Sequence, residues 1–323
     1  MESLKQFEWY KDPSGYRLVR VSPSGRTLFV KPTDHWEGRF EKEESQPREM
    51  SIATTLYRGE KRPARPGLYI AAHRMHPNSD DSPSHVAIRP FEGDELVSLN
   101  LLNSAGSPKA WIEFSNRFGM LRTEKERWHL TGRDRRLFLY SVEAEGEFHH
   151  LCNVLWRIYN YYPAMRTGDA DLLGRFIEWD SDDVVREKWG PVLGGIQTRP
   201  AIAMKGFTVE EDIAISRMNK SDLIAPAAFS IQDHVNRYLK DALSLEVTFD
   251  QQELKFTPSL RYGSLGAALV SEAVDFMTGR FEARQCKVCS SWFRIGHERM
   301  RQDRVFCSAA CKMRDYRKRL KSS

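Results

Sequence analysis

Short strand-like segments dominate the hydrophobic pattern in the first part of the chain. Residues 16–30, YRLVRVSPSGRTLFV, predict two short strands around a turn at 22–25. The segments GLYIAAHRM and SHVAIRPF, which flank a polar turn cluster, are further strand candidates. Two stretches rich in charge and proline, EGRFEKEESQPREM and RGEKRPARPG, predict loops. We therefore expect this part of the chain to be mostly β.

Helical periodicity follows. Trp111, Phe114 and Phe118 predict a short helix that ends at Gly119. From Phe148 onward, apolar residues recur at spacings of three and four, which places them on one helix face. These residues are Leu151, Val154, Leu155, Ile158 and Tyr159.

The remaining pattern predicts three helices and one hairpin. A helix is expected over 230–243, another over 264–279 with Gly279 as its C-cap, and a third near 182–189. The segments LEVTF and ELKFT predict a hairpin. The fold class is therefore α+β, with a β-rich N-terminal part and a helical middle. We expect a body over 1–280, subdivided near 167–200, and a small domain over 281–323.

Composition limits the class of protein. With 41% hydrophobic and 29% charged residues, the 323-residue chain has the composition of a soluble globular protein. No apolar run reaches the roughly 18–20 residues of a membrane helix, and MESLKQFEWYKDPSG lacks the apolar core of a signal peptide. We expect a cytoplasmic protein without a membrane partner.

Four of the five cysteines lie close together near the C-terminus, as Cys286-x2-Cys289 and Cys307-x3-Cys311. A two-residue gap lets a turn aim both sulfurs at one point, and a three-residue gap does the same across the first turn of a helix. Ser308 is a natural N-cap for that helix. We predict one structural zinc ion held by these four thiolates. Zinc would also stabilise a core as small as Trp292, Phe293 and Phe306.

Other interpretations of this segment explain less of the pattern. A redox CxxC motif does not explain the second pair, and chance spacing would leave the thiols without a metal. His297 lies between the pairs and is an alternative ligand, although a solvated loop histidine is the simpler interpretation.

The cysteine segment resembles a treble-clef zinc finger. The order is Cys-x2-Cys-x3-Phe, an Arg-rich hairpin, Phe306-Cys307-Ser308-x2-Cys311, and then further arginines. It is similar to the CGNR-type fingers at the C-terminus of bacterial proteins assigned as transcription regulators. The chain differs from them in the gap of its second pair and in having Lys312-Met313-Arg314 after the last cysteine. The resemblance therefore implies a treble-clef relative, and the stretch WIEFSNRFGML resembles only uncharacterised bacterial proteins.

Charge is unevenly distributed. Residues 284–323 contain twelve Lys and Arg against three acidic residues, a net charge of +9, so residues 1–283 carry −4. Arg314, Arg317, Lys318 and Lys321 lie after the last cysteine at helical spacing and form one cationic stripe. Such a stripe favours a nucleic-acid backbone, contacted without base specificity. The residues predicted to bind nucleic acid are Arg301, Arg304, Arg314, Arg317, Lys318, Arg319 and Lys321.

No set of residues predicts a catalytic centre. His149 and His150 lie near Cys152, but that cysteine is flanked by apolar residues and a structural role is favoured. His297 has the position of the catalytic histidine of treble-clef nucleases but lacks a companion residue. A second metal site is a weaker hypothesis, formed by His73, His76, Asp80 and Asp81.

The sequence thus predicts a zinc protein that binds nucleic acid, with DNA favoured over RNA, and that acts as a transcription regulator. The alternative is a protein-interaction or defence-related module in which the zinc finger is purely structural and a protein is the partner.

Overall fold

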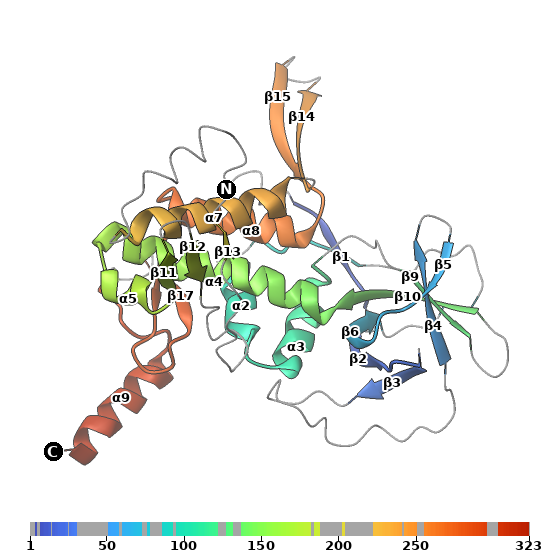
Figure 1. Ribbon diagram of the computed structural model, residues 1–323, viewed down its shortest axis with the longest axis horizontal. Coiled ribbons are helices and arrows are strands. Elements are labelled where there is room, and N and C mark those ends of the chain that lie inside the picture. The colour runs from blue at the N-terminus through green and yellow to red at the C-terminus, as the bar shows by residue number, and fades with distance from the viewer. Residues whose placement is uncertain are drawn as a thin grey trace. The chain divides into compact units, whose positions relative to one another are not determined.

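The chain folds as an α+β protein, as predicted, with helices and several small sheets in the computed structural model (Figure 1). Contacts between Cα atoms divide it into two units. The first contains Met1–Glu95, Ser104–Cys152 and Leu239–Leu269, and the second Leu96–Asn103, Asn153–Tyr238 and Val270–Ser323. The predicted boundary near residue 280 stays a prediction. The structure describes residues 4, 7–13, 15–24, 26–30, 51–57, 60–72, 76–77, 86–92, 95–121, 127–131, 137–181, 184–187, 202–203, 222–240, 242–250, 255–295 and 303–322.

The first unit contains an antiparallel eight-stranded sheet with the order β3-β2-β6-β10-β9-β4-β5, in which β7 pairs with β10. Because β3 also pairs with the first residues of β4, the series of strand pairings from β3 to β4 is closed. The strands are β2 (Tyr16–Val21), β3 (Arg26–Val30), β4 (Ser51–Tyr57), β5 (Glu60–Pro63), β6 (Gly67–Ala72), β7 (His76–Pro77), β9 (Arg127–Thr131) and β10 (Leu137–Ala144). A buried cluster on this sheet consists of Val19, Val21, Ala64, Tyr69, Ala71 and Val142.

Most of the predicted strands are confirmed. Residues 16–30 form β2 and β3, GLYIAAHRM contains β6, and SHVAIRPF contains β8 (Val86–Ile88), which pairs with β1 (Trp9–Lys11). The predicted hairpin is β14 (Leu243–Asp250) with β15 (Lys255–Tyr262). The loop prediction for RGEKRPARPG was wrong over residues 60–63, which form β5, whereas residues 64–66 lie outside any strand. Within the described residues β5 pairs only with β4, and an edge strand accommodates charge and proline that a central strand would not.

The helix predicted around Trp111 is α3 (Pro108–Phe118). The Ser107 hydroxyl accepts a hydrogen bond from the Ala110 N–H and caps its first turn. The helix ends at Gly119, which has a φ of 86°. The Trp111 ring stacks on Phe148 at a centroid distance of 4.9 Å, and both side chains are fully buried.

The second unit combines helices with two small sheets. One sheet has the order β11-β12-β13, formed by β11 (Ile177–Ser181), β12 (Val184–Glu187) and β13 (Ile202–Ala203). The other pairs β16 (Glu282–Gln285) with β17 (Trp292–Ile295). The helices are α2 (Val97–Ser104), α4 (Glu145–Thr167), α5 (Ala170–Gly174), α7 (Ile224–Leu239), α8 (Leu265–Met277) and α9 (Ala309–Ser322). Of these, α2, α4, α7 and α8 also contribute residues to the first unit.

The helix predicted near 182–189 was wrong, because residues 184–187 form strand β12. Val185 and Glu187, two positions apart, are both buried, and the segment pairs with β11 on one side and β13 on the other, as a strand does. The helix predicted over 230–243 is α7, which begins earlier, at Ile224, and ends earlier, at Leu239, because residue 243 already belongs to strand β14. At its start the Asp222 carboxylate accepts a hydrogen bond from the Ile224 N–H. The helix predicted over 264–279 is confirmed as α8.

The core of the second unit is built around Tyr159 on the apolar face predicted for α4. Its ring lies 4.9 Å from that of Phe276 and 5.4 Å from that of Trp292. Its hydroxyl is hydrogen-bonded to Ser98 Oγ at 2.8 Å. The buried carboxylate of Glu272 accepts from the backbone N–H groups of Val97 and Ser98, so a side chain of α8 satisfies the first turn of α2.

No helix in the described part of the chain combines the length and the apolar character that a membrane span requires.

Candidate metal centre

The first cysteine pair lies on a tight turn between β16 and β17. The Cys286 N–H donates to the Ser291 carbonyl at 2.9 Å, and the Ser290 N–H donates to the Cys286 carbonyl at 2.8 Å. Ser290 has a φ of 57°, which is unusual for a residue other than glycine. The turn therefore brings Cys286 and Cys289, which are separated by two residues, together at one end of the hairpin.

The second pair lies at the start of α9. The Ser308 hydroxyl accepts a hydrogen bond from the Cys311 N–H at 3.2 Å, which confirms the predicted N-cap. The Lys287 N–H donates to the Val305 carbonyl at 3.1 Å and so joins the two cysteine segments. The Arg304 guanidinium donates hydrogen bonds to the carbonyls of Phe306 and Cys307, and so constrains the backbone that leads into Cys307.

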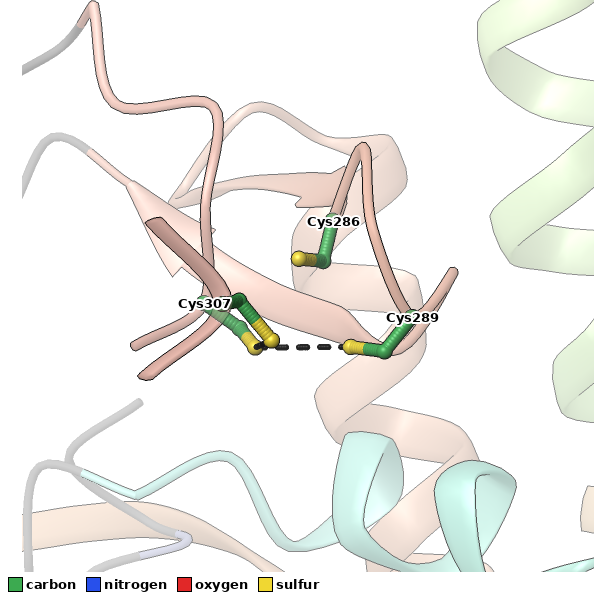
Figure 2. Close-up of side chains that lie close together, drawn as sticks. Cys286, Cys289 and Cys307 are labelled. Carbon is green, nitrogen blue, oxygen red and sulfur yellow. Dashed lines mark hydrogen bonds between the residues drawn. The ribbon is translucent and has the colours of Figure 1, made fainter. Parts of the chain in front are cut away.

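The sulfur atoms of the four cysteines lie close together. Figure 2 shows the thiols of Cys286, Cys289 and Cys307 directed toward one another. The ligand atoms of Cys286, Cys289, Cys307 and Cys311 all lie within 4.8 Å of one another. Cys307 Sγ is 3.5 Å from Cys289 Sγ and 3.6 Å from Cys311 Sγ. A tetrahedron with Zn–S bonds of about 2.3 Å has edges of about 3.8 Å, so the cluster has the size of such a site.

The electrostatics of the cluster favour a cation. Burial disfavours the Cys286 thiolate, but backbone N–H groups of Cys307, Cys289 and Val288 outweigh it and lower the Cys286 pKa to about 6. Burial, together with the neighbouring thiols, raises the pKa of Cys307 to about 12. Hydrogen bonds from Ser291 also lower the pKa of Cys289, so the protein supplies donors for the Cys286 and Cys289 thiolates but opposes a thiolate at Cys307. A divalent ion at the centre would remove that conflict, since it binds all four sulfurs as thiolates.

A small core supports the cluster. Ile295 and Phe281 are buried, while Trp292, Phe293 and Phe306 are each half-buried. The Arg304 guanidinium lies 5.4 Å from the centre of the Phe293 ring. The three aromatic residues predicted as a miniature core are therefore only partly shielded, which fits a segment that needs a metal for stability.

The predicted cationic stripe lies on helix α9, directly after Cys311. Arg314, Arg317 and Lys318 are exposed. Arg319 forms an ion pair with Asp315 one turn earlier. Position 321 belongs to the helix, although the Lys321 side chain lies outside the described residues, as does the whole of Arg301.

Helix α9 also carries an apolar stripe that sequence reasoning missed. Tyr316 on this helix is 57% exposed. Met313 and Leu320, at helical spacing from Tyr316, are 49% and 61% exposed. The spacing of three and four residues between them in the sequence could have indicated this stripe. Their exposure distinguishes them from core residues.

None of the other candidate residues that the structure describes joins a second cluster of metal-ligating groups. Cys152 is fully buried, and burial together with Glu143 raises its pKa well above the ordinary value, as expected for a structural thiol. His149 is half-buried, and burial lowers its pKa to about 4. His73, Asp80, Asp81 and His297 lie outside the described residues, and of His76 only the backbone is described.

No model of a known protein family matches this chain, and neither a curated protein nor a solved structure matches it. The four-cysteine cluster, which can hold a metal ion, is therefore the feature from which a function can be argued.

Proposed function

We propose that residues 281–323 form a treble-clef-like finger that binds one structural zinc ion and presents α9 to the phosphate backbone of DNA. The observation that carries the zinc assignment is the gathering of four sulfurs within 4.8 Å. Four thiolates in a cluster of this size are typical of structural zinc sites, which leave no open position for catalysis.

The nucleic-acid part of the proposal is supported by the cations next to the cluster. Cys311 anchors the first turn of α9, and the exposed Arg314, Arg317 and Lys318 come directly after it. A cation held on a rigid helix loses less conformational freedom on binding phosphate than one on a mobile tail. The net charge of +9 in 284–323 favours a polyanionic partner, and a regulator of transcription is the function that such binding would serve.

Metal analysis tests the site. Purified protein should contain about one equivalent of zinc, and Cys307→Ser should reduce this below about half an equivalent. Cys152→Ala is the matched control, because Cys152 is buried far from the cluster in sequence and should leave the zinc content unchanged. Equal zinc in all three proteins, or none in the wild type, would contradict the assignment.

Salt-dependent DNA binding tests the role of α9. Replacing Arg314, Arg317 and Lys318 by alanine should reduce the slope of log K against log salt by up to about 2.7, since each phosphate contact contributes about 0.9. The control replaces three exposed cations elsewhere, Arg65, Arg175 and Lys240, and changes the net charge equally. The proposal fails if arbitrary duplex DNA does not bind at low salt, or if both triple variants behave alike.

A second candidate function is protein binding through the same helix. The exposed stripe of Met313, Tyr316 and Leu320 favours it, because phosphate contact does not require apolar side chains at this spacing. Alanine at these three positions should then abolish binding to the partner while leaving the salt slope for DNA unchanged. If the same variant instead reduces DNA binding, the apolar stripe belongs to the nucleic-acid surface.

A further inference from the structure

The apolar stripe of α9 lies on the side of the helix that is turned away from the finger. Cys311 and Asp315 are the two residues in the described part of α9 that are not exposed, so they mark the side that the finger covers. At about 100° per residue, Met313, Tyr316 and Leu320 fall within a sector of about 60°. The centre of this sector is about 150° from the covered side. The apolar stripe is therefore the outermost row of the helix.

Cations lie on both sides of the apolar stripe. Arg317 and Arg314 are about 40° and 100° from Met313 in one direction around the helix. Lys312 and Arg319 are about 100° and 120° from Met313 in the other direction. All four cationic residues are exposed, and Arg319, although ion-paired within the helix, keeps 69% of its side chain exposed. The outward side of α9 thus has an apolar centre with positive charge along each flank.

The complementary surface is one with two anionic edges and a less charged floor between them. The major groove of B-DNA has this arrangement, because a phosphate backbone runs along each edge and base edges form the floor. The groove is about 12 Å wide and admits one α-helix. A helix in the groove turns its outermost row to the bases and its two flanks to the two backbones. A single strand has one backbone, which would leave the cations of one flank without phosphate.

The apolar stripe matches one chemical feature of the groove floor. The side chains of Met313 and Leu320 offer no hydrogen-bond donor and no strong acceptor, so they do not pair with the polar edges of bases. The C5 methyl of thymine is the apolar group that the major groove presents. From Met313 to Leu320 the helix rises by about 10 Å, at about 1.5 Å per residue. This length corresponds to about three base pairs, at about 3.4 Å each.

We infer that α9 enters the major groove of duplex DNA and that its apolar stripe packs against thymine methyl groups. The inference rests on the proposed function, to which it adds the groove and the base that are contacted. It also supplies a physical reason for DNA as the partner. The major groove of an RNA duplex is too deep and narrow to be read by side chains, and uracil lacks the methyl group.

Three duplexes of equal length test this inference with the purified full-length protein. They are an alternating dA·dT duplex, an alternating dA·dU duplex, which lacks only the methyl groups, and the corresponding RNA duplex of adenine and uracil. Fluorescence anisotropy at one low salt concentration measures the three affinities. The dA·dT duplex should bind at least about fourfold more tightly than the dA·dU duplex, which is the effect of burying about one methyl group.

Alanine at the three positions of the apolar stripe should remove this preference. The variant should bind dA·dT at least about fourfold more weakly than wild type does, should bind dA·dT and dA·dU equally, and should keep the wild-type affinity for the RNA duplex. Any difference in shape between the two DNA duplexes affects both proteins and cancels in the comparison. The matched control replaces three exposed apolar residues outside α9, Tyr10, Leu245 and Leu260, by alanine and should keep the wild-type preference. Equal zinc content shows that the finger is intact in each variant.

The inference is overturned if the wild type binds dA·dT and dA·dU equally, if the stripe variant keeps the wild-type preference, or if that variant loses as much affinity for RNA as for DNA. If one of these results occurs while Arg314, Arg317 and Lys318 still control the salt slope, phosphate binding stands and the apolar stripe is left for a protein partner. If no duplex binds at low salt, the proposed function fails and this inference fails with it.

Discussion

The side-chain amide of Asn103 is hydrogen-bonded in both directions to the backbone of Trp292. Its Nδ2 donates to the Trp292 carbonyl at 3.1 Å, and its Oδ1 accepts from the Trp292 N–H at 3.0 Å. An asparagine on α2 therefore satisfies the outer edge of β17 as a neighbouring strand would. The hairpin that carries Cys286 and Cys289 is thereby tied to the helical core of the same unit.

Asn103→Ala should loosen this attachment. Trp292 would lose one donor and one acceptor partner on an exposed surface, so we expect a decrease in unfolding free energy of about 1 kcal/mol. Urea unfolding followed by tryptophan fluorescence measures it. Asn103→Asp keeps the acceptor for the Trp292 N–H and should show a smaller loss. Equal stability of Asn103→Ala and wild type would show that the pair does not contribute.

Gly119→Ala should be strongly destabilising. Gly119 has a φ of +86°, and a Cβ there would lie 2.6 Å from the Tyr10 carbonyl oxygen and 3.1 Å from the Trp9 ring. We expect a loss of about 2–4 kcal/mol from the combined backbone strain and overlap. Thermal and urea unfolding give the value.

Gly279→Ala separates the two causes. Gly279 has a φ of +77° at the end of α8, but nothing lies within 4 Å of its added Cβ. Backbone strain alone should lower stability by about 1 kcal/mol. If the two alanine variants lose the same stability, the close approach of Tyr10 to Gly119 has no energetic importance.

The stability of the protein should depend on the charge of Glu272. Burial raises its pKa from 4.5 to about 7, although hydrogen bonds from Ser98 and Val97 and the charge of Arg294 act in the opposite direction. Because the folded state then binds the proton more tightly than the unfolded state, the stabilising contribution is complete below pH 4.5 and is lost as pH rises through about 7.

Glu272→Gln removes this dependence, since the amide oxygen can still accept at α2 without ionising. The stability difference between the variant and wild type should move in favour of the variant by up to about 3 kcal/mol between about pH 5 and pH 8. Taking the difference cancels the titration of the cysteines, which both proteins share. A difference that is constant with pH would contradict the raised pKa.

The five cysteines should react with a thiol reagent such as DTNB in two classes. Metal removal by a chelator should expose Cys286, Cys289, Cys307 and Cys311, whereas Cys152 is fully buried and should react only after denaturation. We expect no rapid reaction with the zinc-loaded protein, four rapid thiols with chelator, and five in denaturant. Four rapid thiols without chelator would show that the cluster does not hold a metal.

The sequence alone determined the features that depend on short separations along the chain. One turn of the chain brings the two cysteines of Cys286-x2-Cys289 together, and one turn does the same for Cys307-x3-Cys311. The local geometry of each pair therefore follows from its spacing and, for the second pair, from the cap at Ser308. The apolar faces of α4 and α8 follow likewise from helical period, because residues three and four apart share one side of a helix.

Only the tertiary structure determined the features that depend on contacts between residues far apart in the sequence. Whether residues 184–187 form a strand or a helix depends on their pairing with β11 and β13, which a local window does not contain. Arg157 and Glu187 meet across 30 positions, and Asn103 and Trp292 across 189. A charged Arg157 within the apolar run of α4 was the sequence signal that a buried partner existed, but its identity required the fold. Hydrophobic periodicity therefore indicated which residues share one side of a helix. Only three-dimensional packing determined which other residues that side contacts.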